Sequence, residues 1–301
     1  TGDLLLKIKA AGVNRADVLQ RQGRYPPPPG ASPTLGLEAS GFVEQVGTEV
    51  EDWCEGDRAC ALLAGGGYAE HVAVPAGLCM PIPEGLSFEQ AAAIPEVFAT
   101  AYQTLFWLGD LQFGGRVLIH AGASGVGTAA IQLAREAGAH PIVTAGSERK
   151  LDACRALGAE LAIDYKRGPF APAVLEATDE RGVDVILDFV AAPYWEQNLQ
   201  CLAPEGRLIL IGSLGGTRVE GFDLRVFLTK RLQVTGTTLR ARSLDYKVRL
   251  VRALAAFALP RFADGRLRPI VDRVFSWAEV AKAHRYMEEN RNIGKIVLAG
   301  M

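Results

Sequence analysis

Short apolar runs alternate with turn residues over roughly the first 90 positions. Strand-like runs cover residues 4–10, 41–46, 58–62 and 68–74. A turn-rich segment, residues 23–36, lies between the first two and contains four consecutive prolines, Pro26 to Pro29. This punctuation of alternating apolar runs predicts a small antiparallel, barrel-like domain.

The pattern changes near Ser87. Ser87 and Gln90 have the spacing of a capping box, and an apolar helix-like run follows to Leu108, in which Pro95 either starts a new helix or kinks the first. Short apolar strands then alternate with helices, which predicts a parallel sheet covered on both faces, a doubly wound domain. The strands are expected at 116–120, 141–145, 160–163, 184–189, 207–211 and 232–238, and helices at 126–137, 148–157 and 195–202.

The last thirty residues predict a strand (270–275), a helix (278–290) and a final strand (295–298). This end is compatible with completing the first domain instead of extending the second sheet. The chain begins at Thr1, directly before a strand-like run, so we expect the natural protein to start further upstream.

Composition narrows the class of protein. The chain has 301 residues with 49% hydrophobic and 22% charged residues, typical of a globular protein of about two domains. The 32 basic and 34 acidic residues give a net charge of −2, which does not favour nucleic-acid or membrane-surface binding by bulk charge. We expect no membrane partner.

The five cysteines are odd in number and form no C-x-x-C pair. This argues against a disulfide framework and a structural zinc lobe, and favours reduced thiols in a cytoplasmic protein. The four histidines have no metal-like spacing, and His120 is expected to be a packed residue.

The strongest motif is the run from His120 to Thr128, which follows a strand and opens a helix. A dinucleotide fingerprint places its three small residues at Gly122, Ser124 and Gly127, with Gly125 and Val126 between the last two. A pyrophosphate would lie on the free N–H groups at the helix N-terminus. The alternative is a purely structural turn, which the strand–loop–helix context disfavours.

The end of the next strand bears on the choice between NAD(H) and NADP(H). An NAD-preferring site has an acidic residue about 20 positions after the glycines. Gly146 occupies that place here, and Ser147 and Lys150 can bind a 2′-phosphate. NADP(H) is therefore favoured, although Ser147 could only cap a helix and Lys150 could be a solvated surface residue.

Seven segments together resemble the medium-chain dehydrogenase/reductase superfamily, and within it the zinc-independent, zeta-crystallin-like quinone oxidoreductases, closest to the tumour-suppressor-inducible branch. These segments are residues 11–17, 20–25, 36–41, 91–96, the loop 120–128, 144–147 and 292–298. The resemblance implies an α/β fold, in which a Rossmann doubly wound parallel sheet is inserted into a GroES-like, mostly-β domain. The expected domains are 1–95 (catalytic), 96–240 (NADP-binding) and 241–301 (connecting helices and return to the catalytic domain).

The resemblance also bears on metal chemistry. Zinc-dependent relatives carry a cysteine and a Gly-His-Glu segment, where this chain has Asn14 and Gly36-Leu37-Glu38. Leucine cannot ligate zinc, so no metal site is expected.

By the same resemblance, Asn14 and Tyr25 lie near the nicotinamide as catalytic residues. Tyr25 could stack on a flat acceptor or donate a hydrogen bond to it, and Asn14 could hold the ring or the acceptor oxygen. The alternatives are a loop anchor beside the prolines for Tyr25 and a turn residue bonding its own backbone for Asn14. Further cofactor contacts carried over are Thr100, Tyr165, Val190, Gly212, Ser213, Leu239 and Lys295.

The function that follows from this resemblance is NADPH-dependent reduction of quinones without zinc. The alternatives are a reductase of enones, alkenals or enoyl thioesters, and an NADPH-binding structural or RNA-binding protein. The resemblance implies a homodimer, and residues 232–238 are a plausible edge strand that pairs with its copy.

Overall fold

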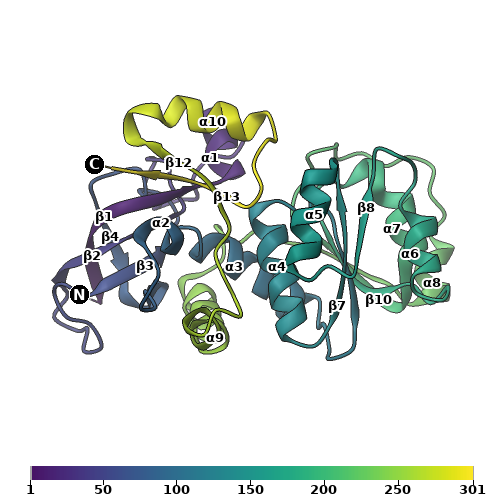
Figure 1. Cartoon of the computed structure of the whole chain (residues 1–301), viewed down its shortest axis with the longest axis horizontal. Helices are drawn as coiled ribbons and strands as arrows, with labels where there is room; N and C mark the ends of the chain where they lie inside the picture. Colours follow the sequence, from purple (N-terminus) through teal and green to yellow (C-terminus); the bar gives the residue numbers. More distant parts are fainter. Residues whose placement is uncertain (1, 301) are drawn as a thin grey trace. The chain divides into compact units, whose positions relative to one another are not determined.

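The computed structural model describes residues 2–300 and divides into two compact units. Unit 1 comprises Thr1–Ala99 and Leu239–Met301, and unit 2 comprises Thr100–Thr238. In Figure 1, unit 1 has the purple, blue and yellow-green segments, and unit 2 the teal and green ones. The second unit is therefore an insertion between two parts of the first.

Unit 1 is built on a seven-stranded sheet. Its order is β12-β13-β1-β2-β3-β5, with β4 also paired to β1. The last strand of the chain pairs antiparallel with the first, with Gly12 opposite Val297, so the C-terminal segment completes the first domain. The strands are β1 (Asp3–Val13), β2 (Glu38–Val46), β3 (Arg58–Leu62), β4 (His71–Pro75), β5 (Cys79–Pro81), β12 (Val271–Ser276) and β13 (Lys295–Ala299).

Two helices of unit 1, α2 and α3, begin where the sequence predicts. Ser87 caps the short helix α2 through the expected capping box with Gln90, and Pro95 starts a new helix instead of kinking the first. The helices are α1 (Arg15–Arg21), α2 (Phe88–Ala91), α3 (Pro95–Tyr102), α9 (Leu244–Ala263) and α10 (Val280–Glu288), with 3₁₀ turns η1 (Ala76–Leu78) and η4 (Trp277–Glu279). The helix α3 runs past Ala99, so its last residues belong to unit 2.

Unit 2 is a six-stranded parallel sheet of order β11-β10-β9-β6-β7-β8. Read from β8, this is the 3-2-1-4-5-6 order of the dinucleotide-binding fold, and it confirms the predicted fold class. The strands are β6 (Arg116–Ile119), β7 (His140–Ala145), β8 (Leu161–Asp164), β9 (Val183–Asp188), β10 (Leu202–Leu210) and β11 (Gln233–Gly236).

The helices of unit 2 carry the apolar residues that cover this sheet. They are the π-helical turn η2 (Gln103–Leu108), α4 (Gly125–Glu136), α5 (Glu148–Leu157), α6 (Ala171–Glu176), the 3₁₀ turn η3 (Ala192–Tyr194), α7 (Trp195–Cys201) and α8 (Arg225–Lys230). Leu118, Ile186 and Leu208 of three neighbouring strands are fully buried beside Phe170 and Val174. A central strand with apolar residues on both faces is what a parallel sheet covered by helices requires.

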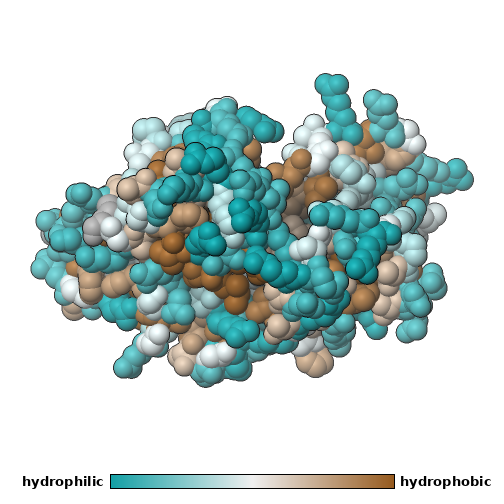
Figure 2. Space-filling view, turned by 45° about the horizontal axis from the view of Figure 1, so that its top comes forward, coloured by the Kyte–Doolittle hydropathy of each residue, from teal (hydrophilic) through white to brown (hydrophobic). Residues whose placement is uncertain are grey.

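Most strand boundaries differ from the predicted ones by a few residues. The largest difference is in unit 2, where β10 begins at Leu202 instead of residue 207. In unit 1, β1 continues to Val13 instead of residue 10 and β4 begins at His71 instead of residue 68. Residues 68–70 leave the strand because Gly65 and Gly66 have positive φ angles and the Tyr68 N–H donates to the Leu35 carbonyl at the end of this turn. Among residues 2–300, no helix is both long and apolar enough to cross a membrane. Figure 2 shows hydrophilic residues over much of one face, with hydrophobic residues between them.

Candidate active site

The predicted phosphate loop connects β6 to α4 in unit 2. Ser124 is the N-cap of α4, and its Oγ accepts a hydrogen bond of 3.1 Å from the Gly127 N–H. A Cβ on Gly127 would lie 2.5 Å from the carbonyl oxygens of Ala121 and Gly122, and one on Gly122 would lie 2.7 Å from Val143 Cβ. Both glycines are therefore needed for close packing of helix, loop and strand. The loop leaves the first N–H groups of α4, at Gly125 and Val126, for an anionic ligand.

A buried network of polar side chains holds the start of the phosphate loop in place. His120 Nε2 lies 2.7 Å from Asn198 Oδ1, and Asn198 Nδ2 donates to Asp188 Oδ2 at 2.9 Å. Because the Asn198 amide donates to Asp188, its oxygen faces the histidine, so His120 carries its proton on Nε2. Its Nδ1 then accepts from Thr144 Oγ1 at 2.9 Å. Burial lowers the pKa of His120, so it is a neutral packed residue, as its sequence context predicts.

This network joins three strand ends to the segment that contains Val190. Asp188 Oδ1 accepts from the N–H groups of Val190 (2.6 Å) and Ala191 (3.1 Å), and Ala191 has a φ of 68°. The predicted contact Val190 is therefore held in place by the same carboxylate that Asn198 binds. Fully satisfied hydrogen bonds of this kind make the segment rigid.

The end of β7 has no acidic side chain at the position where NAD-preferring sites have one. A Cβ on Gly146 would lie 2.7 Å from the Tyr165 hydroxyl, so a larger residue does not fit there. Ser147 is the N-cap of α5 but makes no side-chain cap bond, and Lys150 lies in the first turn of that helix. Ser147 and Lys150 thus follow the carboxyl end of β7, and the half-exposed Tyr165 follows the end of the neighbouring strand β8.

The remaining predicted contacts divide between the units. Gly212 and Ser213 lie one residue beyond the end of β10 in unit 2, at the same edge of the sheet as the loops after β6, β7 and β9. Thr100 is buried in α3, and its carbonyl accepts from Thr104 Oγ1. Leu239 is a buried residue of unit 1.

Unit 1 contains a buried ion pair that sequence reasoning missed. Lys295 Nζ lies 2.6 Å from Glu38 Oε1, and both side chains are almost fully buried. The lysine also donates to Asn14 Oδ1 at 2.6 Å and to the Val13 carbonyl at 2.7 Å. All three Nζ protons are thereby used within unit 1. The Lys295 ammonium group is thus bound within this internal network, and its expected contact with the cofactor stays a prediction.

Asn14 belongs to the same network. Its Nδ2 donates to Glu38 Oε1 at 2.9 Å, and its backbone N–H donates to Asp17 Oδ2 as part of the capping box of α1. Asp17 is buried and also accepts from the Gly36 N–H, and burial raises its pKa to about 6. The side chain of Asn14 therefore links Glu38 to Lys295. Its expected place beside a nicotinamide stays a prediction.

Tyr25, the second predicted catalytic residue, has two charged neighbours in unit 1. The guanidinium carbon of Arg240 lies 5.5 Å from the centre of the Tyr25 ring. Burial is the largest cause that raises the pKa of the Tyr25 phenol; the carboxyl group of Glu96, at the start of α3, adds to the rise, and Arg240 opposes it. Neither Glu96 nor Arg240 was identified from the sequence as a site residue, although Glu96 is a charged residue in an otherwise apolar run.

The positions that bear zinc ligands in zinc-dependent relatives do not fit a zinc ion here. Leu37 is a buried apolar residue, and the Asn14 side chain is held by Lys295 and Glu38. Zinc requires thiolate, imidazole or carboxylate ligands, so these two side chains cannot replace the cysteine and histidine.

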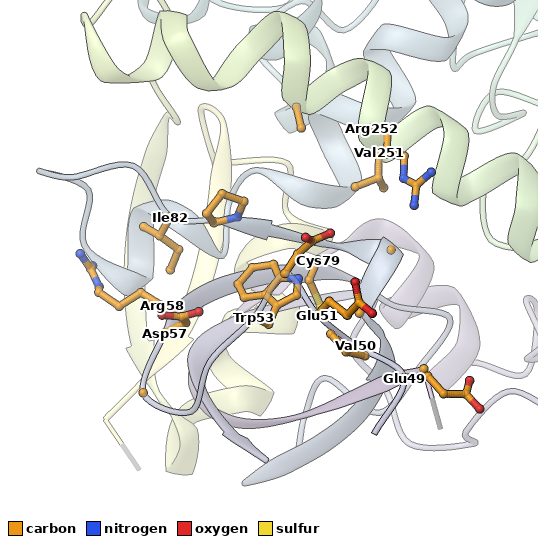
Figure 3. Close-up of a pocket in the computed structure, with 17 residues that line it drawn as sticks. Glu49, Val50, Glu51, Trp53, Asp57, Arg58, Cys79, Ile82, Val251 and Arg252 are labelled. Atoms are coloured by element: carbon orange, nitrogen blue, oxygen red, sulfur yellow. The ribbon is translucent and has the colours of Figure 1, made fainter. Parts of the chain in front are cut away.

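A separate cleft of about 910 Å³ lies on another part of unit 1 (Figure 3). Trp53, Cys79 and Ile82 line it together with Glu51 and Arg252. None of the predicted site residues is among those that line it.

Comparisons with known proteins agree with this architecture. Residues 1–84 match the family described as "Alcohol dehydrogenase GroES-like domain", and residues 125–256 match "Zinc-binding dehydrogenase". The human synaptic vesicle membrane protein VAT-1 homolog is 33% identical over 99% of this chain and 79% of its own length. The chain therefore belongs to the medium-chain dehydrogenase/reductase superfamily of oxidoreductases.

A second relative is far longer than this chain. A phenolphthiocerol/phthiocerol polyketide synthase of Mycobacterium tuberculosis is 34% identical over 98% of this chain, which spans only 13% of that protein. Its similarity concerns one segment of a large enzyme.

Solved structures of several activities share the fold. A quinone oxidoreductase of Thermus thermophilus, described also in its complex with NADPH, has a TM-score of 0.83 and 36% identity, over 99% of this chain and 92% of that one. The CurK enoyl reductase has a TM-score of 0.85 and 29% identity over 99% and 91%. An NAD-dependent alcohol dehydrogenase has a TM-score of 0.86 and 32% identity over 100% and 92%. The predicted superfamily is confirmed, and the narrower branch stays a prediction.

Proposed function

We propose that this protein is a zinc-independent reductase that uses NADPH to reduce quinones. The observation that carries the proposal is the close packing of the phosphate loop at Gly122 and Gly127. At the end of the next strand, Gly146, Ser147 and Lys150 stand in place of an acidic residue. The 36% identity to a quinone oxidoreductase described in complex with NADPH supports the same assignment.

The residues of unit 2 fit a dinucleotide phosphate. The N–H groups of Gly125 and Val126 would bind the pyrophosphate at the positive end of α4. Ser147 and Lys150 would bind the 2′-phosphate by a hydrogen bond and by charge, and Tyr165 would pack against the adenine ribose. Val190, Gly212 and Ser213 would border the nicotinamide half, with Thr100 and Leu239 as further contacts.

When bound, NADPH supplies a hydride, and the protein must place the acceptor and exclude water. The acceptor oxygen gains negative charge as its conjugated carbon system receives the hydride. Tyr25 can donate a hydrogen bond to that oxygen, which is the stabilisation that zinc provides in zinc-dependent relatives. Asn14 positions the segment that leads into α1 through its bonds to Lys295 and Glu38.

The alternative within enzymes is a reductase of enones, alkenals or enoyl thioesters. The similarity to the CurK enoyl reductase and to a segment of a polyketide synthase supports this alternative. Both classes of acceptor can accept a hydride at a carbon conjugated with a carbonyl group, so the same Tyr25 chemistry serves both.

The test is the oxidation of NADPH and of NADH with a small quinone, with and without a metal chelator. We expect turnover that prefers NADPH and is unchanged by the chelator. Tyr25→Phe should lower the rate about 10- to 100-fold while NADPH binding persists. Binding of NADPH without reduction of quinone, enone or thioester would instead support a structural or RNA-binding protein, which RNA gel shifts at graded salt would then test.

A further inference from the structure

Asp188, the last residue of β9, is a fully buried carboxylate. Its bonded partners are the backbone N–H groups of Val190 and Ala191 and the side-chain amide of Asn198, all of them neutral donors. No cation forms an ion pair with Asp188 in the part of the chain that the structure describes. Burying a charge is costly unless hydrogen bonds and a counter-charge compensate it, and here only the hydrogen bonds are present.

The histidine of the same network does not neutralise this charge. His120 is joined to Asp188 only through Asn198, whose Oδ1 lies 2.7 Å from His120 Nε2. Burial is the largest cause that lowers the pKa of His120, so its ring is neutral near pH 7. The charge of Asp188 also acts on Tyr194, whose pKa is raised to about 12 by burial first, then by Tyr165 and by Asp188. Asp188 is therefore a source of negative potential at this end of the sheet.

The segment that Asp188 holds is strained. Ala191 has a φ of 68° and a ψ of −115°, a combination that glycine favours and that a side chain makes costly. The bonds from the Val190 and Ala191 N–H groups to the carboxylate hold this conformation, and the Gly215 N–H donates to the Val190 carbonyl at 2.9 Å from the loop after β10. Backbone strain that surrounding bonds keep in place is typical of ligand-binding segments.

The strand order relates Asp188 to one half of a dinucleotide. In the order 3-2-1-4-5-6, β6 is the first strand and β9 the fourth, so the order reverses between these two neighbours. A dinucleotide crosses the sheet at this point, with one half on each side. The phosphate loop and Ser147 follow β6 and β7, on the adenine side. The nicotinamide half is therefore expected on the side of β9 and β10, where Asp188 lies.

We propose that the charge of Asp188 makes a bound nicotinamide a stronger hydride donor, because the carboxylate attracts the oxidised ring, a cation, and not the reduced ring, which is neutral. This inference rests on the proposed function and deepens it, since such a site favours reduction of an acceptor over oxidation of an alcohol. Asp188 makes no contact with the reacting atoms in this proposal. It positions Val190 and Ala191, and it acts on the ring through its charge.

The reaction balances without a group that accepts electrons from the protein. A hydride leaves the reduced ring with two electrons and forms a C–H bond on the acceptor. The ring is oxidised and gains a positive charge, and the acceptor is reduced and gains a negative charge on its oxygen, which takes a proton from water. Asp188 exchanges neither proton nor electron, and its negative potential lowers the free energy of the oxidised ring.

The variant Asp188→Asn removes the charge while the network can keep its hydrogen bonds. The new amide oxygen still accepts the two backbone N–H groups, and the new amide N–H donates to the Asn198 oxygen once the Asn198 amide has turned over. The Asn198 amide then donates to His120 Nε2, and His120 carries its proton on Nδ1, facing Thr144 Oγ1. This variant therefore separates the charge of Asp188 from its structural role.

The test is the binding of NADP⁺ and of NADPH, each without an acceptor, measured by isothermal titration calorimetry. We expect Asp188→Asn to weaken NADP⁺ about 5- to 20-fold more than NADPH, the order of the effect of one buried charge acting over several ångströms. Asp188→Ser, in which a hydroxyl can accept the same backbone N–H groups, should shift the ratio likewise and serves if Asp188→Asn does not fold. The double variant Asp188→Asn/Asn198→Asp returns a carboxylate to the next position of the network and should restore part of the ratio.

Asp164→Asn is the matched control. Asp164 ends β8 and accepts the Lys166 N–H at 3.0 Å, as Asp188 accepts that of Val190, but its carboxylate lies 3.5 Å from Arg167. This control removes the same charge at another strand end and should change the ratio of the two affinities less than about twofold.

A second readout needs no cofactor. Nitrogen NMR spectra of the histidine rings should place the His120 proton on Nε2 in wild type and on Nδ1 in Asp188→Asn, which shows that the network persists without the charge. Equal weakening of NADP⁺ and NADPH by Asp188→Asn and Asp188→Ser, or the same ratio shift in Asp164→Asn, would overturn the proposal. A wild type that binds neither cofactor would overturn the proposed function as well. The expected shift of the ratio in a protein that reduces no acceptor would support this proposal and overturn only the reductase assignment.

Discussion

Lys295 of the last strand and Glu38 of the second strand form an ion pair of 2.6 Å in the interior of unit 1. The glutamate lies in the segment that resembles the zinc-binding segment of zinc-dependent relatives, and Asn14 bridges the pair from the cysteine position. A lysine charge and two amide hydrogen bonds thus occupy a region where a metal ion would otherwise hold the elements together. We therefore expect the pair to contribute mainly to the free energy of unfolding.

Removing one member of this pair should be strongly destabilising. Lys295→Met leaves Glu38 buried with no cation bonded to it, and we expect a loss of about 3–5 kcal/mol in the free energy of unfolding. Urea denaturation measures it. The control is Arg225→Met, which breaks an ion pair whose side chains are 82% and 61% exposed and should cost less than about 1 kcal/mol. Similar losses in the two variants would show that the buried pair has no special role.

Glu96 should make the protein less stable as the pH rises. The unfolded chain releases this proton near the ordinary value of 4.5, whereas the folded protein keeps it until about pH 8. Between these values only the folded state holds the proton, so the free energy of unfolding falls as pH increases and is lowest above pH 8. Glu96→Gln should therefore gain about 1–2 kcal/mol over wild type at pH 9 relative to pH 5. Urea denaturation of both proteins at both pH values measures this. A stability difference between variant and wild type that does not change with pH would contradict the expectation.

Lys150 should distinguish the two cofactors. A charge-assisted bond to the 2′-phosphate is worth about 1.5–3 kcal/mol, so Lys150→Ala should weaken NADPH about tenfold or more and NADH less than about twofold. Fluorescence titration of both cofactors measures this. Arg149→Ala, one position earlier in the same helical turn, is the control. Equal weakening of NADPH and NADH by Lys150→Ala would mean that this lysine does not bind the 2′-phosphate.

The edge strand β11 should form the contact between two copies of the chain. It pairs with β10 on one side only within residues 2–300, and Leu228 of the preceding helix is 77% exposed. Unprotected edges pair with other strands, and lysines on an edge prevent this. We expect light scattering to report a dimer for wild type and a monomer for Gln233→Lys/Thr235→Lys. A monomeric wild type at working concentration would refute the contact.

The sequence predicts the fold well where local chemistry decides it. The capping box at Ser87, the helix start at Pro95 and the loop around Gly122 are all set by residues within a few positions of each other. Periodicity locates the parallel strands because their apolar runs are short and bounded by helices. Boundaries were less accurate where a distant partner extends a strand, as β13 does for β1.

Only the part of the candidate site that is formed by residues close together in the sequence could be predicted. The phosphate loop and Gly146 are contiguous motifs, whereas the charged groups that act on Tyr25 come from α3 and from the segment after Leu239. Lys295 illustrates the difficulty, because its position in the last strand gives no sign that its side chain meets Glu38 and Asn14. Long-range charge pairing leaves no pattern in a single sequence.

The placement of β13 between β12 and β1 has a consequence for biosynthesis. Unit 2 is one continuous stretch of chain and can fold as soon as residue 238 has left the ribosome. The sheet of unit 1 has to wait, because the strand β13 that pairs with β1 and the lysine that neutralises Glu38 come after the inserted unit in the chain. Until then the first hundred residues carry an unpaired edge of β1 and an uncompensated acid, so the nascent chain needs protection from aggregation over the entire length of the insertion.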